Sequence, residues 1–138
     1  MLSKIDHIGI VTEDTEAVVR LFEERLGCKV SKKESSDAGF VKSTFLHFDN
    51  VQIEITEPSD PDNFYSKMVK KRGTCLSHIA FSAEDVVEEC EELEKRDFGF
   101  REGFGPDRIT PRGLRVAFID PNQTEGVQIQ LIAEHPIG

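Results

Sequence analysis

Two histidines and two oxygen-bearing side chains occupy matching places in the two halves of this 138-residue chain. His7 and His78 each lie inside a short apolar run, I-D-H-I-G-I and L-S-H-I-A-F. Glu54 and Gln130 each lie near the end of their half, in V-Q-I-E-I and V-Q-I-Q-L. Two imidazoles with two oxygen donors suit a divalent first-row metal such as Zn, Co, Ni, Fe or Mn, with positions left for water or substrate. If a pseudo-two-fold axis relates the halves, the four side chains can converge on one ion.

The repeat extends beyond these four side chains. Glu13 and Asp14, which follow the first histidine run, recur at the same offset as Glu84 and Asp85 after the second. Two echoes in the same order indicate an internal duplication. In each closing strand, alternation puts the polar residues on one face and the aliphatic residues on the other. Each half therefore presents one histidine from its first strand and one oxygen donor from its last.

Apolar periodicity predicts the order β-α-β-β-β in each half. In the first half we expect strands at 3–11, 29–34, 41–48 and 51–56, a helix at 13–26 ended by Gly27, and then a short helix at 64–71. In the second half we expect strands at 76–81, 98–102, 114–119 and 126–132, a helix from Ser82 to about Asp97, and a long loop at 103–113. Neither module alone could bury a sufficient core, so the two should share one. We therefore expect a single domain over 1–138, with module 1 at about 1–58, a linker helix at about 59–74 and module 2 at about 75–138.

Composition narrows the class of protein. A net charge of −9 argues against a general nucleic-acid or membrane-surface binder, because phosphate contacts need a basic face. One local run is basic, and it contains Lys67, Lys70, Lys71 and Arg72. Its ordinary interpretation is a solvated helix end. Three cysteines without metal-type spacing, no signal peptide and no apolar stretch of transmembrane length lead us to expect a cytoplasmic protein with reduced thiols.

Each site residue also has an ordinary structural interpretation. A single histidine in an apolar strand is usually a hydrogen-bonded core residue, and a Glu or Gln on a strand usually faces solvent. Taken one at a time, these interpretations are favoured by about three to one. The occurrence of all four at equivalent positions of a duplicated unit reverses the preference. His47 and His135 have no such counterpart, and no role is assigned to them.

The quoted stretches, with K-K-R-G-T-C-L-S-H-I-A-F and R-V-A-F-I-D-P-N-Q-T-E-G-V-Q-I-Q-L, resemble the vicinal oxygen chelate superfamily over nearly the whole chain. Within it, the pattern is most similar to methylmalonyl-CoA epimerases. The resemblance implies an α+β fold in which two βαβββ modules form one cupped, mostly antiparallel eight-stranded sheet with helices on its outer face. It also implies one divalent metal ion (Co, Ni, Zn or Mn) held by His7, Glu54, His78 and Gln130.

The function implied by the resemblance is that of a metal-dependent isomerase, which abstracts a proton alpha to the carbonyl of a carboxy-acyl-CoA. These epimerases carry a Glu where this chain has Gln130, so the base proposed for that carboxylate is missing. We therefore assign Glu54 as ligand and base, and Asp37, ahead of Gly39, as a second acid–base candidate. The phosphates of a CoA substrate could meet the basic run at 67–72, or instead Arg108, Arg112 and Arg115.

Two alternatives stay open. A glyoxalase I-like lyase acting on a thiol hemithioacetal uses the same enediolate chemistry and would be served by two histidines and Glu54. A non-catalytic small-molecule binding or resistance protein would need no metal, and the retention of four polar positions argues against it. An iron dioxygenase is disfavoured because its facial triad needs a carboxylate where Gln130 stands. The expected partners are a small-molecule substrate and a second copy of the chain in a homodimer, with no nucleic acid and no membrane.

Overall fold

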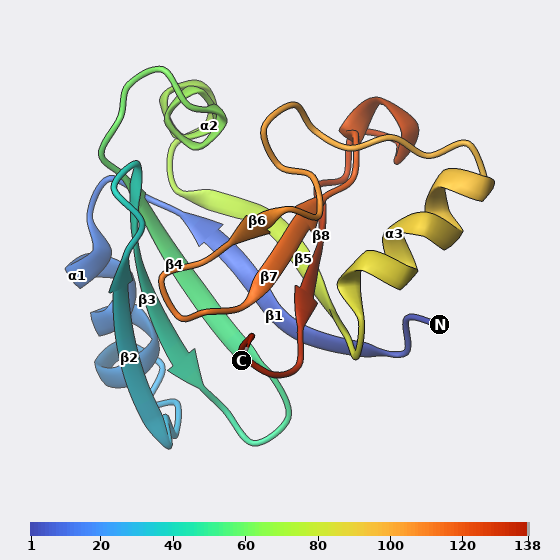
Figure 1. Cartoon of the computed structure of the whole chain (residues 1–138). Helices are drawn as coiled ribbons and strands as arrows, with labels where there is room; N and C mark the ends of the chain where they lie inside the picture. The colour runs from blue at the N-terminus through green and yellow to red at the C-terminus, as the bar shows by residue number, and fades with distance from the viewer. Residues whose placement is uncertain (138) are drawn as a thin grey trace. The chain divides into compact units, whose positions relative to one another are not determined.

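The structure, a computed structural model that describes residues 1–137, contains one eight-stranded sheet and three α-helices (Figure 1). The strands are β1 (Lys4–Val11), β2 (Lys32–Asp37), β3 (Val41–His47), β4 (Gln52–Pro58), β5 (Cys75–Ala83), β6 (Arg108–Ile109), β7 (Arg115–Phe118) and β8 (Ile129–Ala133). The helices are α1 (Thr15–Arg20), continued by a π-helical turn η1 (Leu21–Arg25), α2 (Phe64–Arg72) and α3 (Val86–Lys95), with a 3₁₀ turn η2 (Pro121–Gln123). The strand order is β2-β3-β4-β1-β5-β8-β7-β6.

The chain divides into two compact units. One contains Met1–Asp6 and His78–Gly138, and the other contains His7–Ser77. Each unit repeats the same pairing scheme: in the first-half unit β4 pairs parallel with β1 and antiparallel with β3. In the second, β8 pairs parallel with β5 and antiparallel with β7. This equivalence is what the duplicated sequence predicts.

In the first-half unit, α1 covers the sheet face that carries the aliphatic residues. Asp14 caps the helix, because its side chain accepts a hydrogen bond from the backbone N–H of Ala17. Val18 packs against Leu46 of β3 and Ile55 of β4, all buried. Since residues two apart in a strand share a face, Gln52, Glu54 and Thr56 of β4 project to the side away from α1.

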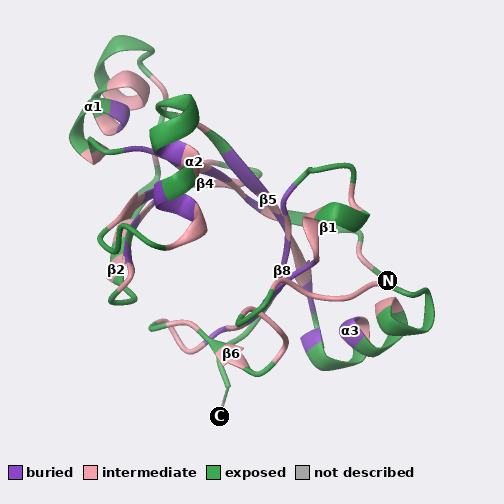
Figure 2. Ribbon diagram, turned by 90° about the horizontal axis from the view of Figure 1, so that it is seen from above, coloured by how far each residue is buried: buried purple, intermediate pink, exposed green. Residues whose placement is uncertain are grey.

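The second unit is built in the same way. Asp85 caps α3 by accepting from the N–H of Glu88. The buried side of α3, seen in Figure 2, carries Val86 and Cys90, which pack with Leu131 of β8. The polar residues of β8 therefore project away from α3. In both units the helix covers the face opposite the candidate ligands.

The predicted fold class is confirmed, with two corrections among its strands. The strand predicted at 98–102 is wrong: only Phe100 makes a single bridge, to Ile119, and the sheet resumes at β6 inside the predicted loop. Regular pairing is interrupted there by a turn in which the N–H of Phe104 donates to the carbonyl of Arg101, and Gly103 within it has a φ of +78°. The second correction is that β2 begins at Lys32 and runs to Asp37, three residues beyond the predicted strand end at 34.

The helix predicted at 13–26 divides into α1 and the π-helical turn η1, and Gly27 follows with a φ of +65° as expected of a helix stop. The start predicted at Ser82 is four residues early, since Asp85 is the cap. The division into modules 1–58 and 75–138 with a linker stays a prediction. No helix in the described part of the chain has the length and apolar character needed to span a membrane.

Candidate metal centre

His7 and Glu54 meet within the first-half unit. The Nε2 atom of His7 lies 3.3 Å from Oε1 of Glu54, with side-chain exposures of 1% and 13%. Their strands are adjacent, and the register sets Gln52 opposite His7 and Glu54 opposite Gly9. Gly9 has no side chain, so the space above it is open to the carboxylate of Glu54. A buried imidazole beside a partly buried carboxylate is a pair of metal ligands of the types that zinc and its neighbours bind.

A phenylalanine borders this pair on the other side. Phe45 lies directly opposite Glu54 on β3, so the two side chains share a face. Its ring packs edge-on against the His7 imidazole, with centroids 5.8 Å apart at 86°. This contact fixes the ring plane of His7, as a ligand requires.

The second unit repeats the arrangement around His78 and Gln130. Ala80, a small residue, lies opposite Gln130 where Gly9 lies opposite Glu54. Phe118 lies opposite Gln130 on β7, and its ring packs edge-on against His78 at 5.4 Å and 77°. The duplication therefore preserves the neighbours of the candidate ligands as well as the ligands.

Gln130 carries an unsatisfied polar atom. Gln130 is 8% exposed, and its Oε1 atom has no hydrogen-bond partner within residues 1–137. A buried amide oxygen without a partner costs about 1–3 kcal/mol, so such atoms usually serve a ligand or an ordered molecule. The neighbouring Gln128 differs, because its Oε1 accepts a hydrogen bond from Nη2 of Arg101 at 2.8 Å.

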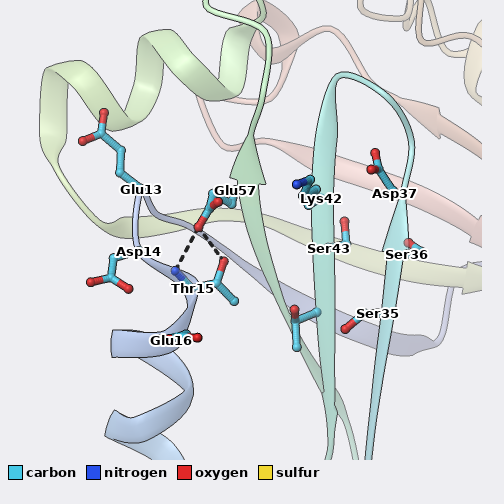
Figure 3. A pocket seen from close by; sticks show the side chains of 11 residues that line it. Glu13, Asp14, Thr15, Glu16, Ser35, Ser36, Asp37, Lys42, Ser43 and Glu57 are labelled. Carbon is cyan, nitrogen blue, oxygen red and sulfur yellow. Dashed lines mark hydrogen bonds between the residues drawn. The ribbon is translucent and has the colours of Figure 1, made fainter.

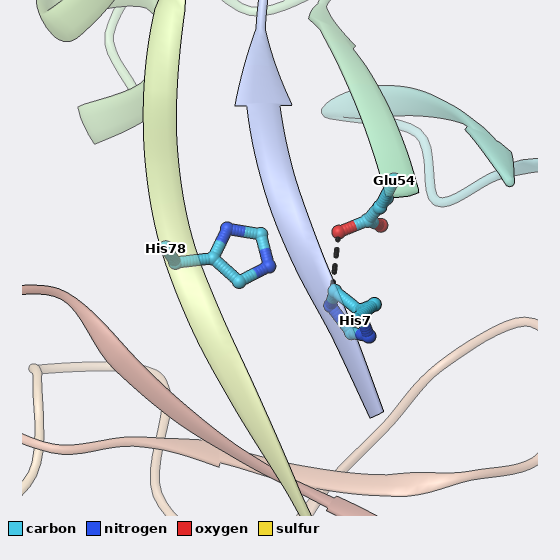
Figure 4. Close-up of side chains that lie close together, drawn as sticks. All are labelled: His7, Glu54 and His78. Carbon is cyan, nitrogen blue, oxygen red and sulfur yellow. Dashed lines mark ion pairs between the residues drawn. The ribbon is translucent and has the colours of Figure 1, made fainter. Parts of the chain in front are cut away.

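The ligand atoms of His7, Glu54 and His78 all lie within 4.8 Å of one another (Figure 4). Two ring nitrogens and one carboxylate oxygen at this spacing form a group that could hold a metal ion. The orphaned oxygen of Gln130 has the chemistry of a further ligand. The donor types therefore fit a divalent ion of the N/O-binding kind.

The structure does not bring Asp37 to Glu54. Asp37 of β2 lies opposite Lys42 of β3 in the strand register, and Lys42 lies opposite Glu57 of β4. Oε1 of Glu57 accepts hydrogen bonds from the backbone N–H and the hydroxyl of Thr15 at the start of α1. These side chains line a pocket of about 630 Å³ on the α1 side of the sheet (Figure 3). Glu54 projects from the other face. Because β2 extends to Asp37, strand alternation sets this residue on the face away from Glu54, and the acid–base role of Asp37 stays a prediction.

The basic side chains predicted to meet phosphates lie in two places. Lys67, Lys70, Lys71 and Arg72 are all exposed on α2. Arg108 and Arg115 are instead tied to their own loop, through hydrogen bonds to the carbonyl oxygens of Gly103 and Pro106. Arg108 also lies over the ring of Phe104, 4.4 Å from its centroid.

One pair on the polar face was not anticipated. Nε2 of His47 lies 3.0 Å from Oε2 of Glu34, and Nζ of Lys32 lies 2.7 Å from Oε1 of the same carboxylate. The predicted strand at 29–34 ended at Glu34, so its pairing with β3 could not be derived. The Asp37–Gly39 turn is the signal that would have extended the strand, because the Asp37 carboxylate accepts the N–H of Gly39.

The sequence model of the Glyoxalase/Bleomycin resistance protein/Dioxygenase superfamily matches residues 6–118, most of the chain. The chain belongs to this superfamily. The chain is similar to the uncharacterised protein YqjC of Bacillus subtilis, which is 28% identical over 94% of this chain and 91% of its own length. The ethylmalonyl-CoA/methylmalonyl-CoA epimerase of Cereibacter sphaeroides is 24% identical over 95% of this chain and 98% of its own length.

The chain is also similar to a solved structure, that of a variant of Streptomyces coelicolor methylmalonyl-CoA epimerase in complex with 2-nitronate-propionyl-CoA. It has 25% identity and a TM-score of 0.83 over 96% of this chain and 95% of that one. Enzymes of the epimerase type are thus among the relatives and structural neighbours of the chain.

Proposed function

We propose that the protein is a metal-dependent isomerase that abstracts the proton alpha to the carbonyl of a carboxy-acyl-CoA, with methylmalonyl-CoA as the model substrate. The observation that carries the proposal is the grouping of His7, Glu54 and His78, with ligand atoms within 4.8 Å. The names of the epimerase relatives, and the acyl-CoA ligand in the Streptomyces structure, support the substrate class.

In this proposal His7, Glu54, His78 and Gln130 hold one divalent ion, of Co, Ni, Zn or Mn. The ion, when bound, supplies Lewis-acid stabilisation of the enolate-like charge, worth several kcal/mol. Gln130 contributes an amide oxygen where the epimerase pattern has a carboxylate, so Glu54 is the single negative protein ligand. The histidines bind as neutral imidazoles, held in plane by Phe45 and Phe118.

Glu54 is the proposed base. A carboxylate that receives the α-proton of the substrate contributes typically ~10²–10⁴-fold to the rate when it is correctly placed. Its surroundings are poor in water, since His7 is 1% exposed and Val11, two strand positions beyond Gly9 on the same face, is 0% exposed. Electrostatic interactions are stronger in such a place than in bulk water. The phosphates of CoA would meet the exposed cations of α2.

The test is α-proton exchange in deuterated water. Protein loaded with Co²⁺ should remove the α-proton signal of methylmalonyl-CoA in the NMR spectrum, and protein treated with chelator should not. Absence of exchange on every carboxy-acyl-CoA, together with turnover of a methylglyoxal–thiol adduct, would contradict the proposal and favour the glyoxalase-like lyase. Binding of either compound without turnover or metal would favour the non-catalytic binding protein.

A further inference from the structure

An arginine reaches the face of the second unit that carries Gln130. Nη2 of Arg101 donates a hydrogen bond to Oε1 of Gln128 at 2.8 Å. Gln128 immediately precedes β8, and its carbonyl accepts the N–H of Ile79 in β5. Residues two apart in an extended segment project from the same face, and Gln128 and Gln130 are 7% and 8% exposed. The guanidinium of Arg101 therefore lies beside Gln130, roughly 7 Å along the strand from that candidate ligand.

The backbone around Arg101 explains this reach. Phe100 makes the single bridge to Ile119, and the N–H of Arg101 donates to the carbonyl of Phe118 in β7. Phe100 packs against the buried cluster under α3, so Arg101, the next residue, projects from the opposite face. Phe118 lies directly opposite Gln130. The side chain of Arg101 thus extends across β7 toward β8, on the face of the candidate ligand.

The other side of Gln130 is apolar. Ile132, two residues after Gln130, projects from the same face, and Val116 lies opposite it in β7. These two side chains belong to a buried cluster that also contains Ala80 and Leu114. Along this face, Gln130 therefore separates a guanidinium from an aliphatic surface. An acyl group whose α-carbon carries a carboxylate on one side and an alkyl group on the other matches this order.

The charges favour an anion at the polar end of this face. A guanidinium presents five N–H donors in a planar fork that suits a carboxylate, and the contact with Gln128 involves one of them. Gln128 and Gln130 are neutral amides, so neither of them balances the positive charge of Arg101. Because both amides are buried, a carboxylate that arrives here is attracted more strongly than it would be in bulk water.

We propose that Arg101 is the specificity-determining residue that binds the free carboxylate of the carboxy-acyl group. The inference rests on the proposed function. The guanidinium donates hydrogen bonds to the substrate carboxylate, and Gln128 holds the guanidinium in place. The alkyl substituent of the α-carbon lies toward Val116 and Ile132. The amide at Gln130 belongs to this arrangement, because a glutamate there would compete with the substrate carboxylate for Arg101.

The deciding experiment compares methylmalonyl-CoA with propionyl-CoA, which has the same CoA and alkyl parts and lacks only the carboxylate. Calorimetric titration of Co²⁺-loaded protein gives the dissociation constant of each compound. The unmodified protein should prefer methylmalonyl-CoA, and Arg101→Gln should reduce that preference by about 10–100-fold, the worth of a hydrogen bond to a charged group. Arg101→Lys keeps the charge and should retain part of the preference. Both compounds carry the same phosphates, so equal weakening of both, or an unchanged ratio, would overturn the inference.

Arg108→Gln is a matched control. Arg108 is also partly exposed and follows Arg101 closely in the chain, but its Nη1 donates to the carbonyl oxygen of Gly103. Loss of this charge could weaken both acyl-CoAs through their phosphates, and the ratio of the two dissociation constants should stay unchanged. Arg101→Gln and Arg108→Gln should both keep the Co²⁺ absorption spectrum of the unmodified protein.

Gln128→Glu tests the same role with Arg101 still present. A carboxylate at this position would pair with the guanidinium, so the preference for methylmalonyl-CoA over propionyl-CoA should fall. A preference that persists in this variant and in Arg101→Gln would contradict the inference. Because the side chain is changed at a different residue, this variant gives an answer even if Arg101→Gln does not fold.

Binding and proton exchange separate the two ways in which the inference could fail. If the unmodified protein neither binds methylmalonyl-CoA nor exchanges its α-proton in deuterated water, the proposed function fails and the inference fails with it. If the unmodified protein exchanges the α-proton, and Arg101→Gln leaves the ratio of dissociation constants unchanged, only the role of Arg101 fails.

Discussion

His7 and Glu54 make their 3.3 Å contact across a diagonal of the sheet, because the parallel register of β1 and β4 sets Gly9, and not His7, opposite Glu54. The diagonal is possible where the directly opposite residue has no side chain. Ala80 stands in the same relation to Gln130. A small residue two positions after each histidine is thus part of the candidate metal centre.

His7→Ala and His78→Ala should each strip bound metal and leave the fold largely intact. Loss of a direct ligand should weaken binding by more than the roughly 10–100-fold that follows removal of an outer-shell partner. Elemental analysis after reconstitution with Zn, Co, Ni or Mn, beside circular dichroism, measures both effects. If the unmodified protein retains none of these metals, the metal centre is contradicted.

Gln130→Glu should bind the metal at least as tightly, because a carboxylate adds negative charge where the amide oxygen has no partner. Chelator competition gives the affinity. Gln128→Glu is the comparison, since Arg101 already occupies that side-chain oxygen. Equal and negligible effects of both substitutions on metal affinity would remove Gln130 from the ligand set.

Glu54→Gln should suppress α-proton exchange by ~10²–10⁴-fold, the typical worth of a positioned base. Asp37→Asn should leave exchange within about twofold, because Asp37 projects from the α1 side of the sheet and an amide oxygen can still accept the N–H of Gly39. Both substitutions replace a carboxylate with its amide, but Glu54 and Asp37 lie on opposite faces of the sheet. Exchange that falls as far in Asp37→Asn would restore Asp37 to the mechanism.

The double substitution Lys70→Glu with Lys71→Glu should raise the KM for an acyl-CoA and leave kcat almost unchanged. Both side chains are exposed on α2, so they can meet phosphates without contact with the reacting carbon. The corresponding acyl-pantetheine, which lacks the phosphates of the nucleotide, should show no change in KM. If Arg112→Glu reproduces the effect and the α2 variant does not, the loop at 103–113 holds the phosphates.

Cys90 should resist alkylation at pH 8, whereas the partly exposed Cys28 and Cys75 react. Burial, with the nearby Glu94 and Glu89 carboxylates, raises the pKa of the Cys90 thiol from about 9 to about 12. The folded state therefore keeps its proton where the unfolded state has lost it, and the free energy of unfolding should fall as the pH rises from 9 toward 12. Chemical denaturation of Cys90→Ala across this range should lack that decline.

The sequence predicted the strands and helices that carry strong periodicity, and missed those set by turns. The histidine strands β1 and β5 were placed within two residues because their apolar runs are too short for a helix. The 98–102 strand was wrong because the turn from Arg101 to Phe104, with Gly103 at a positive φ, leaves only the Phe100–Ile119 bridge in place of a regular ladder. Such a turn leaves little trace in hydrophobic pattern.

In the candidate metal centre, too, periodicity predicted some of the residues, whereas others depend on strand register. Alternation in β4 and β8 was enough to predict which side chains share the inner face with the histidines. The partners of Glu34 depend on the register of the β2–β3 hairpin, and a one-residue shift in register exchanges the faces of a strand. Periodicity alone could not fix that register, and the predicted strand ended at 34, so the face on which Asp37 lies was not predicted.

The two outermost strands have a bearing on how the protein behaves when it is concentrated. β6 is only two residues long, and β2, the other edge, reads K-K-E-S-S-D. A very short edge and a charged edge both discourage another chain from adding a strand by main-chain hydrogen bonds. The open sheet should therefore resist fibril formation and stay dispersed at high concentration, with like-charged molecules kept apart by their net charge of −9.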